Sequence, residues 1–139
     1  MNILLELEGI FRVLLSVILV FPIGYEREEI KKPAGLRTHM LISMGSAVFT
    51  FLSLHGFPGS DPSRMASYIV AGIGFVGAGA IIRERDKVVG VTTAASLWVS
   101  ASIGISSGAG FYLIAVGASI LTYLILRAKP SVINIFKRG

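Results

Sequence analysis

The sequence lacks cysteine altogether and is poor in charge. Without cysteine the chain can form neither disulfides nor thiolate metal sites. Charged residues make up only 15% of the 139 residues and hydrophobic residues 53%, whereas a soluble domain carries about a quarter of its residues as charges. This composition disfavours an ordinary soluble domain and favours a small integral membrane protein.

The chain is also short of the residues that many enzymes use at their active sites. It has only two histidines, His39 and His55, which lie near the two ends of one apolar segment. A lone histidine in such a place is more often a polar anchor than a ligand, so we assign neither to a metal. No hydrolytic triad, haem ligand or zinc spacing is found. We therefore expect a protein that is not an enzyme and that carries no cofactor.

Apolar residues gather in five segments, each near the length of about 17 to 25 residues that crosses a bilayer. We expect an all-α, polytopic membrane protein whose residues 1–139 form a single transmembrane domain. Its first segment should stay attached, because the start MNILLELEGIF is acidic where a signal peptide is basic. The approximate helices are residues 4–24, 38–54, 65–82, 91–106 and 111–126.

Positive charges orient this bundle. Eleven of the thirteen Lys and Arg residues fall on one side of the predicted membrane, only Arg64 falls on the other, and Arg12 lies inside the first helix. By the positive-inside rule, the N terminus lies outside and the C terminus lies in the cytoplasm. The basic balance is therefore a topology signal, and we expect no nucleic-acid partner. The eleven are Arg27, Lys31, Lys32, Arg37, Arg83, Arg85, Lys87, Arg127, Lys129, Lys137 and Arg138.

The stretch GIGFVGAG contains the G-x-G-x-x-G pattern of a dinucleotide-binding loop. That loop needs a preceding strand and a turn, and this apolar segment has neither. Small residues in a membrane helix instead let neighbouring backbones approach closely. We favour this packing role over phosphate binding for the four glycines of the stretch, which are Gly72, Gly74, Gly77 and Gly79.

The next segment carries small and hydroxyl residues at every fourth position, which would form one narrow stripe on a helix. One interpretation is a packing seam whose hydroxyls bond to backbone carbonyls, and the other is a hydroxyl-lined solute path. The packing seam is the commoner arrangement. The stripe consists of Thr92, Ser96, Ser100, Gly104 and Gly108.

Ionisable residues inside or beside the helices allow two interpretations each. Arg12 follows Glu8 by four residues, so the two can form a buried helical ion pair, or Arg12 can extend outward to the membrane surface. Asp61 precedes Pro62 and can cap the third helix, or it can act with Arg64 on solutes at the outer mouth. An active Asp61→Asn variant would leave Asp61 as a cap.

Several blocks together resemble the signatures of the MgtC/SapB membrane protein family. They are GYER, KPAGLRTHMLISMGSA, DPSR, GIGFVGAGAIIR and GVTTAASLWVSASIG, in that order from about Gly24 to Gly104. Many members continue into a soluble cytoplasmic domain, whereas this sequence stops thirteen residues after Leu126. The residues that the resemblance marks, without assigning roles, are Glu26, Arg27, Arg37, Thr38, Asp61, Arg64, Thr92, Thr93 and Ser96.

The resemblance implies a bacterial inner-membrane protein that contributes to adaptation to scarce magnesium and, in pathogens, to survival inside host cells. The family is labelled a candidate magnesium transporter, and its members are also viewed as regulators of other membrane proteins, including ATP synthase. We expect the lipid bilayer and a second copy of the chain, most simply in a dimer, as partners. The resemblance adds another membrane protein such as ATP synthase. A role that needs the soluble domain is in doubt for this sequence.

Elementary chemistry compares the two activities. Mg²⁺ sheds water reluctantly and prefers octahedral oxygen ligands, usually including a carboxylate or two. The acidic residues fall at the two predicted membrane surfaces, and none lies between them. We therefore favour regulation by interaction, and keep transport of Mg²⁺ or another small solute by an oligomer as the alternative.

Overall fold

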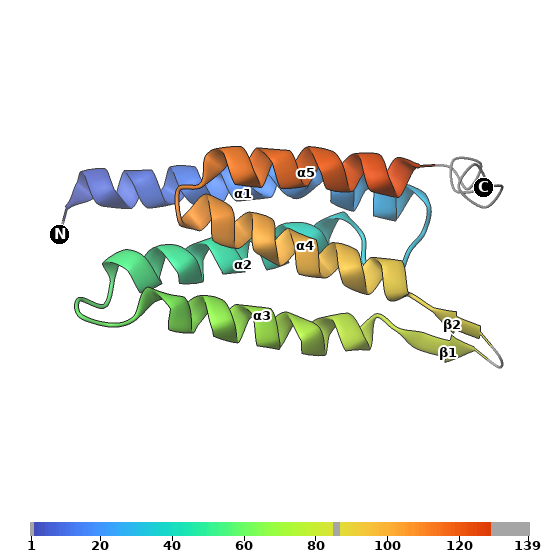
Figure 1. Ribbon diagram of the computed structural model, residues 1–139. Coiled ribbons are helices and arrows are strands. Elements are labelled where there is room, and N and C mark those ends of the chain that lie inside the picture. Colours follow the sequence, from blue (N-terminus) through green and yellow to red (C-terminus); the bar gives the residue numbers. More distant parts are fainter. Residues whose placement is uncertain (1, 85–86, 129–139) are drawn as a thin grey trace, which may run out of the picture.

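The computed structural model describes residues 2–84 and 87–128. It contains five helices and one short antiparallel hairpin between the third and fourth helices (Figure 1). The predicted all-α class and the five helices are confirmed, and the hairpin was not predicted. The elements are α1 (Ile3–Glu29), α2 (Leu36–His55), α3 (Pro62–Gly79), β1 (Ile82–Glu84), β2 (Lys87–Val89), α4 (Val91–Gly108) and α5 (Tyr112–Arg127).

Several helix ends differ from the approximate prediction, most of all the end of α1 and both ends of α3. Helix α1 continues past Gly24 to Glu29, because the charged residues that follow Gly24 are good helix formers. Helix α3 ends at Gly79, three residues before the predicted end, because the chain turns there into the hairpin. The hairpin returns against the end of α3 at Gly90, whose φ is +92° and whose Cβ, if present, would lie 1.9 Å from the Ala80 carbonyl oxygen. Only glycine fits that approach.

The sequence predicted that each helix crosses a membrane. Among the residues that the structure describes, no helix combines the length and the apolar character that a membrane crossing requires.

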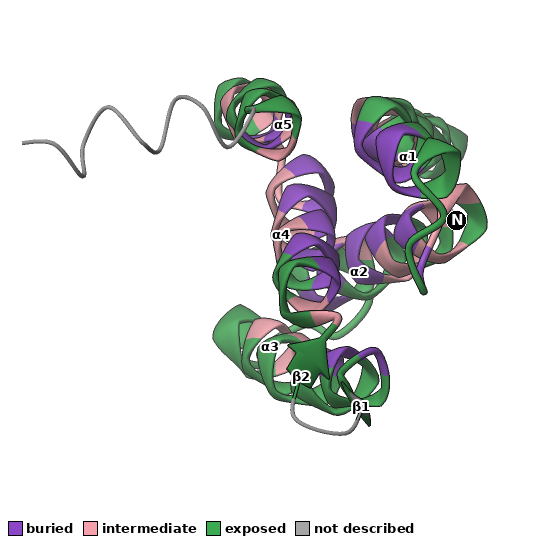
Figure 2. Ribbon diagram, turned by 90° about the vertical axis from the view of Figure 1, so that its right-hand side faces the viewer, coloured by how far each residue is buried: buried purple, intermediate pink, exposed green. Residues whose placement is uncertain are grey.

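Helix α4 is the centre of the bundle and contacts each of the other four helices. Successive helices run in opposite directions, so the ends of α1, α3 and α5 meet the beginnings of α2 and α4 (Figure 1). Helix α3 stands at the edge: it contacts α2 and α4, and only Ile73 and Gly77 of its residues are buried (Figure 2). The bundle therefore has a four-helix body and one helix with a largely uncovered face.

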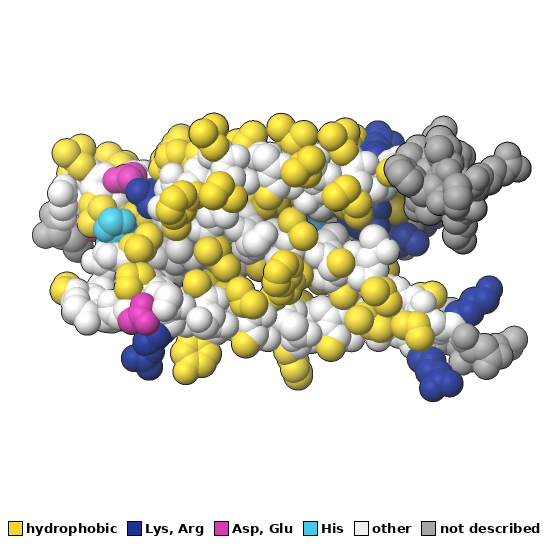
Figure 3. Space-filling model, viewed as in Figure 1, with side chains coloured by type: hydrophobic (Ala, Val, Ile, Leu, Met, Phe, Trp, Pro, Cys, Tyr) yellow, Lys and Arg dark blue, Asp and Glu magenta, His cyan; other side chains and the backbone are white. Residues whose placement is uncertain are grey.

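The interior of the bundle is unusually polar and its surface unusually apolar. Among the described residues, fourteen polar or charged residues are buried, against ten hydrophobic ones, and large apolar side chains are exposed on every helix. Figure 3 shows such side chains spread over one face. Soluble domains show the opposite distribution for charged groups, which are almost never fully buried unless paired. The buried polar residues are Ser16, Glu26, Arg27, His39, Ser43, Ser46, Thr50, Ser53, Thr93, Ser96, Ser100, Ser107, Ser119 and Thr122.

The basic residues lie mostly where α1, α3 and α5 end. Arg12 and Arg64 lie toward the other end of the bundle, as Figure 3 shows for the charged side chains on that face. The described part of the chain therefore keeps the asymmetry that the sequence predicted. Of the residues in that prediction, Arg85, Lys129, Lys137 and Arg138 lie outside the described residues.

Candidate functional site

Two groups of interacting ionisable side chains lie in the bundle, one toward each end: the first is buried, and the second is buried only in part. The Glu26 cluster consists of Glu26, Arg27, His39 and Ser96. The Arg12 cluster consists of Glu8, Arg12, Phe51 and the Gly108 carbonyl. Buried hydroxyls of α1, α2 and α4 occupy the interior between them. Both clusters join helices that are far apart in the sequence, so both are candidate sites.

The Glu26 cluster begins with an ion pair between neighbouring residues. The Arg27 Nε lies 2.5 Å from Glu26 Oε2, and Arg27 Nη2 lies 2.9 Å from Glu26 Oε1. Both residues are about 95% buried. Consecutive helical residues do not normally face each other, so both side chains must bend toward one point. Removing either partner would leave an uncompensated buried charge, which is strongly destabilising.

His39 connects α2 to α4 within this cluster. Its Nδ1 lies 2.8 Å from the Gly35 carbonyl oxygen, and its Nε2 lies 2.9 Å from Ser96 Oγ. The Ser96 hydroxyl is also 2.8 Å from the Thr93 carbonyl oxygen. Gly24 lets α1 approach α2 closely here, because a Cβ there would lie 2.8 Å from Leu36 Cα and 3.2 Å from His39 Cβ. The histidine that the sequence suggested as a surface anchor is therefore fully buried.

The protonation state of the His39 ring decides which groups donate and which accept in these hydrogen bonds. A carbonyl oxygen only accepts, so His39 Nδ1 must carry a proton. With a neutral ring, Nε2 accepts the single Ser96 proton, and the Thr93 carbonyl loses that donor. With a charged ring, Nε2 donates to Ser96, and the Ser96 hydroxyl donates to Thr93. When His39 gains a proton, the Ser96 O–H thus turns from His39 Nε2 to the Thr93 carbonyl, and no heavy atom needs to move.

The stripe predicted on α4 is buried, but it starts at a different residue. Thr92 is exposed and Thr93 is almost fully buried. Steps of four residues drift around a helix of 3.6 residues per turn, so a buried stripe must mix steps of three and four. The observed stripe therefore runs through Thr93, Ser96, Ser100, Gly104 and Ser107.

Glycines of α4 bring α2 and α4 into close contact. A Cβ at Gly104 would lie 2.3 Å from the Ser43 carbonyl oxygen, and one at Gly108 would lie 2.5 Å from that of Ala47. The Ser100 hydroxyl donates to the Ser96 carbonyl at 2.9 Å. These bonds are what the packing-seam interpretation predicted.

The α3 glycines behave differently. Only Gly77 packs inside the chain, where a Cβ would lie 3.5 Å from the Ala94 Cβ. At Gly72, Gly74 and Gly79 a Cβ would meet nothing within 4 Å. These three glycines therefore make no close helix contact within this chain, and their predicted packing role stays a prediction.

In the Arg12 cluster, Arg12 turns inward. Its Nη1 donates to the Gly108 carbonyl at 2.8 Å, Nη2 pairs with Glu8, and the guanidinium lies 5.6 Å from the centre of the Phe51 ring. Its side chain is only 11% exposed. Of the predicted buried pair, only Arg12 is turned inward, since the Glu8 side chain is 46% exposed. Arg12 contacts the end of α4 through Gly108 and contacts α2 through Phe51. In the described residues, three buried polar atoms lack a hydrogen-bond partner: Arg12 Nε, Thr50 Oγ1 and Ser107 Oγ.

Asp61 and Arg64 lie at the start of α3, on the surface. The Asp61 carboxylate caps the helix by accepting from the Ser63 N–H and hydroxyl, each at 2.9 Å. Those two bonds hold the pKa of Asp61 below its usual value. Pro62 occupies the first turn. The predicted cap is confirmed, and the predicted action on solutes stays a prediction.

The structure brings together only some of the marked residues. Glu26, Arg27, Thr93 and Ser96 gather around His39, which the family blocks contain but which we had not chosen. The sequence contained an indication that His39 is buried, because the polar residues Ser43 and Ser46 follow it in α2 at steps of four and three. The residues that lie apart from this cluster are Arg37, Thr38, Asp61, Arg64 and Thr92.

Metal ligation has no obvious centre in this arrangement. Within residues 2–84 and 87–128, no three His, Asp or Glu side chains converge as they would around a metal ion.

Comparisons with known proteins give one consistent result. The model of the MgtC family matches residues 13–135. The chain is 46% identical over 127 residues to "Putative magnesium transporter YhiD" of Escherichia coli (strain K12), which covers 86% of this chain and 59% of that protein. It is 43% identical over 128 residues to "Protein MgtC" of Salmonella typhimurium (strain LT2), covering 90% and 55%. An uncharacterized protein of Haemophilus influenzae is 38% identical over 131 residues, covering 87% and 55%.

The chain thus spans less than two thirds of the length of these relatives. No solved structure matches it.

Proposed function

The chain belongs to the MgtC family, and on this premise we propose that it is a bacterial cytoplasmic-membrane protein that supports magnesium homeostasis by binding and regulating other membrane proteins. The observation that carries the proposal is the reversed surface of the bundle. Its interior holds the Glu26–Arg27 pair, His39 and many hydroxyls, and large apolar side chains are exposed on its outside.

The exposed apolar side chains support a lipid environment. They occur on all five helices and include Leu14, Phe49, Phe75, Trp98 and Leu113, which are 51% to 90% exposed. Leaving a large apolar side chain in water forgoes about 1.5–3 kcal/mol of burial energy, so a surface of this kind favours contact with lipid or protein.

Helix α3 supports the proposed binding activity. It has only two buried residues, and its Phe75 is 86% exposed. Gly74 and Gly79 leave open space beside it, where a helix of another protein can approach closely. We therefore propose the uncovered face of α3 as the surface that contacts a regulated protein or a second copy of the chain.

Transport is the second candidate, and two observations favour it. The E. coli relative carries the name of a magnesium transporter. The buried hydroxyls between the two charged clusters supply oxygens, which Mg²⁺ prefers. We rank it second because most of these hydroxyls bond to backbone carbonyls, as a packing seam requires.

One pair of experiments separates the two candidates. The first measures Mg²⁺ uptake into liposomes that contain the purified protein, against empty liposomes. The second places a photocrosslinking residue at Phe75 in cells grown in low magnesium, with the same residue at Ile18 of α1 as control, because Ile18 is 65% exposed.

The proposal expects no uptake above empty liposomes and a defined membrane-protein adduct from position 75 alone. It also expects Gly74→Leu to lose both the adduct and growth in low magnesium, whereas Gly117→Leu of α5 keeps them. Protein-dependent Mg²⁺ uptake without an adduct at position 75 would contradict the proposed regulation and support transport.

A further inference from the structure

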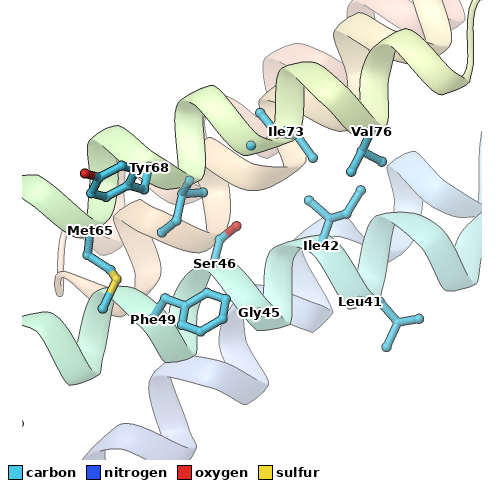
Figure 4. A pocket seen from close by; sticks show the side chains of 11 residues that line it. Leu41, Ile42, Gly45, Ser46, Phe49, Met65, Tyr68, Ile73 and Val76 are labelled. Atoms are coloured by element: carbon cyan, nitrogen blue, oxygen red, sulfur yellow. The ribbon is translucent and has the colours of Figure 1, made fainter.

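Helices α2 and α3 enclose a long apolar hollow, the α2–α3 groove, of about 460 Å³. Figure 4 shows its two sides, with Ile42 and Phe49 on α2 and Ile73 and Val76 on α3. Two glycines, Gly45 and Gly72, widen it, because a Cβ at either position would meet nothing within 4 Å. The groove therefore has room for a slender apolar chain.

A second hollow of about 290 Å³ continues the groove toward the loop before α3. Met65 and Tyr68 line both hollows, so the two are joined side by side. The second one is lined by apolar and polar residues, and the polar ones include Ser60, Asp61 and Arg64. The combined space is thus apolar along most of its length and charged at one end.

The charges at that end have opposite signs. The Asp61 carboxylate is ionised at neutral pH, and Arg64 lies three residues later. Within the described residues, the ion pairs join Arg12 with Glu8 and Arg27 with Glu26, so Asp61 and Arg64 are not paired with each other. One negative and one positive side chain therefore lie at the same end of the combined groove.

We propose that this combined groove binds one molecule of phosphatidylethanolamine, with its ammonium on Asp61, its phosphate on Arg64 and one acyl chain along the α2–α3 groove. An ammonium donates hydrogen bonds to a carboxylate, and a guanidinium forms strong hydrogen bonds to phosphate. This inference rests on the proposed membrane location.

The length of the groove agrees with this ligand. From Arg64 to Val76 the helix rises about 18 Å, at about 1.5 Å per residue. One leaflet of a bilayer has a hydrocarbon depth of about 15 Å, half of the usual 30 Å. An acyl chain that starts at Arg64 therefore ends near the end of the groove.

Native mass spectrometry of the detergent-purified protein tests the proposal. The protein is titrated with phosphatidylethanolamine, phosphatidylcholine and phosphatidylglycerol of equal chain length. We expect one bound phosphatidylethanolamine with at least fivefold preference over the other two. Gly72→Leu, which fills the groove, should weaken binding at least tenfold, and Arg64→Gln should weaken it severalfold.

Gly117→Leu is the matched control, because it adds the same side chain to an open position of α5 that does not line the groove. It should bind lipid as the unmodified protein does. Equal binding by Gly72→Leu and Gly117→Leu, or equal binding of the three lipids, would overturn the proposal. A dimer that retains no lipid and dissociates in Gly72→Leu would also overturn it and assign the groove to a second copy.

Membrane fractionation separates this inference from the proposed function. If the protein fractionates with membranes but shows no selective retention, only the lipid site fails. If it does not fractionate with membranes, the proposed function fails as well.

Discussion

His39 illustrates what the sequence could and could not predict at the scale of single residues. The family blocks contain it, but a histidine near the end of an apolar segment gives no sign of the direction in which its ring points. Likewise, Glu26 and Arg27 were both marked, yet their pairing was not expected, because consecutive helical residues diverge. Contacts across helices, such as His39 with Ser96, depend on packing that no single segment encodes.

The hydrogen bonds of His39 lead to the first residue-scale prediction. The Nδ1 proton should be present throughout the titration, and Nε2 should gain a proton on acidification, because the Gly35 carbonyl only accepts. The measurement is ¹⁵N NMR of the labelled imidazole in the His55→Gln variant, which leaves His39 as the single histidine.

A control variant tests the role of the serine. Ser96→Ala should change the Nε2 signal and leave the Nδ1 signal largely as it was, since only Nε2 contacts that hydroxyl. A neutral ring protonated at Nε2 instead of Nδ1 would contradict the assignment.

At the scale of elements, the sequence predicted the helices well and their details less well. Apolar segments marked all five helices, but the β1–β2 hairpin was missed because its three-residue strands are too short to show a pattern. The small-residue stripe of α4 was placed correctly except at Thr92, where a strict step of four leaves the buried face. For the glycines of α3 the packing role stays a prediction, because small residues permit close packing without indicating which helix is the partner.

The contact of α4 with α2 gives an element-scale prediction. Gly104→Ala should destabilise the bundle by about 1–3 kcal/mol, because its Cβ would collide with the Ser43 carbonyl and force the helices apart. Gly117→Ala should be neutral or slightly stabilising, since a Cβ there meets nothing within 4 Å. Unfolding of both variants in detergent, followed by circular dichroism, makes the comparison. Equal stability of the two would show that the contact at Gly104 is not tight.

At the scale of the whole molecule, the composition already predicted a small integral membrane protein. What it could not show was the arrangement, with α4 in the centre and α3 at the edge, because every segment is similarly apolar. Whether a helix lies at the centre or at the edge depends on which of its faces carry hydroxyls and on how those faces pack against several neighbouring helices at once.

The asymmetry of charge gives a prediction for the whole molecule. Reporter fusions should place residue 1 outside and residue 139 in the cytoplasm, because the basic residues gather where α1, α3 and α5 end. The measurement uses paired reporters, one active only outside the membrane and the other only in the cytoplasm. A fusion at residue 1 that is active in the cytoplasm would reverse the orientation.

The central place of α4 also has a consequence for how the protein is made. In lipid, the inner face of α4 with Thr93, Ser96 and Ser100 would be poorly matched to its surroundings as long as the helix stands alone. Its main partner, α2, precedes it in the chain and is synthesised with α1 beside it. During biogenesis, α1 and α2 would therefore form a hairpin first, and α4 would pack against it as soon as it is synthesised. Its hydroxyls would then have little contact with acyl chains.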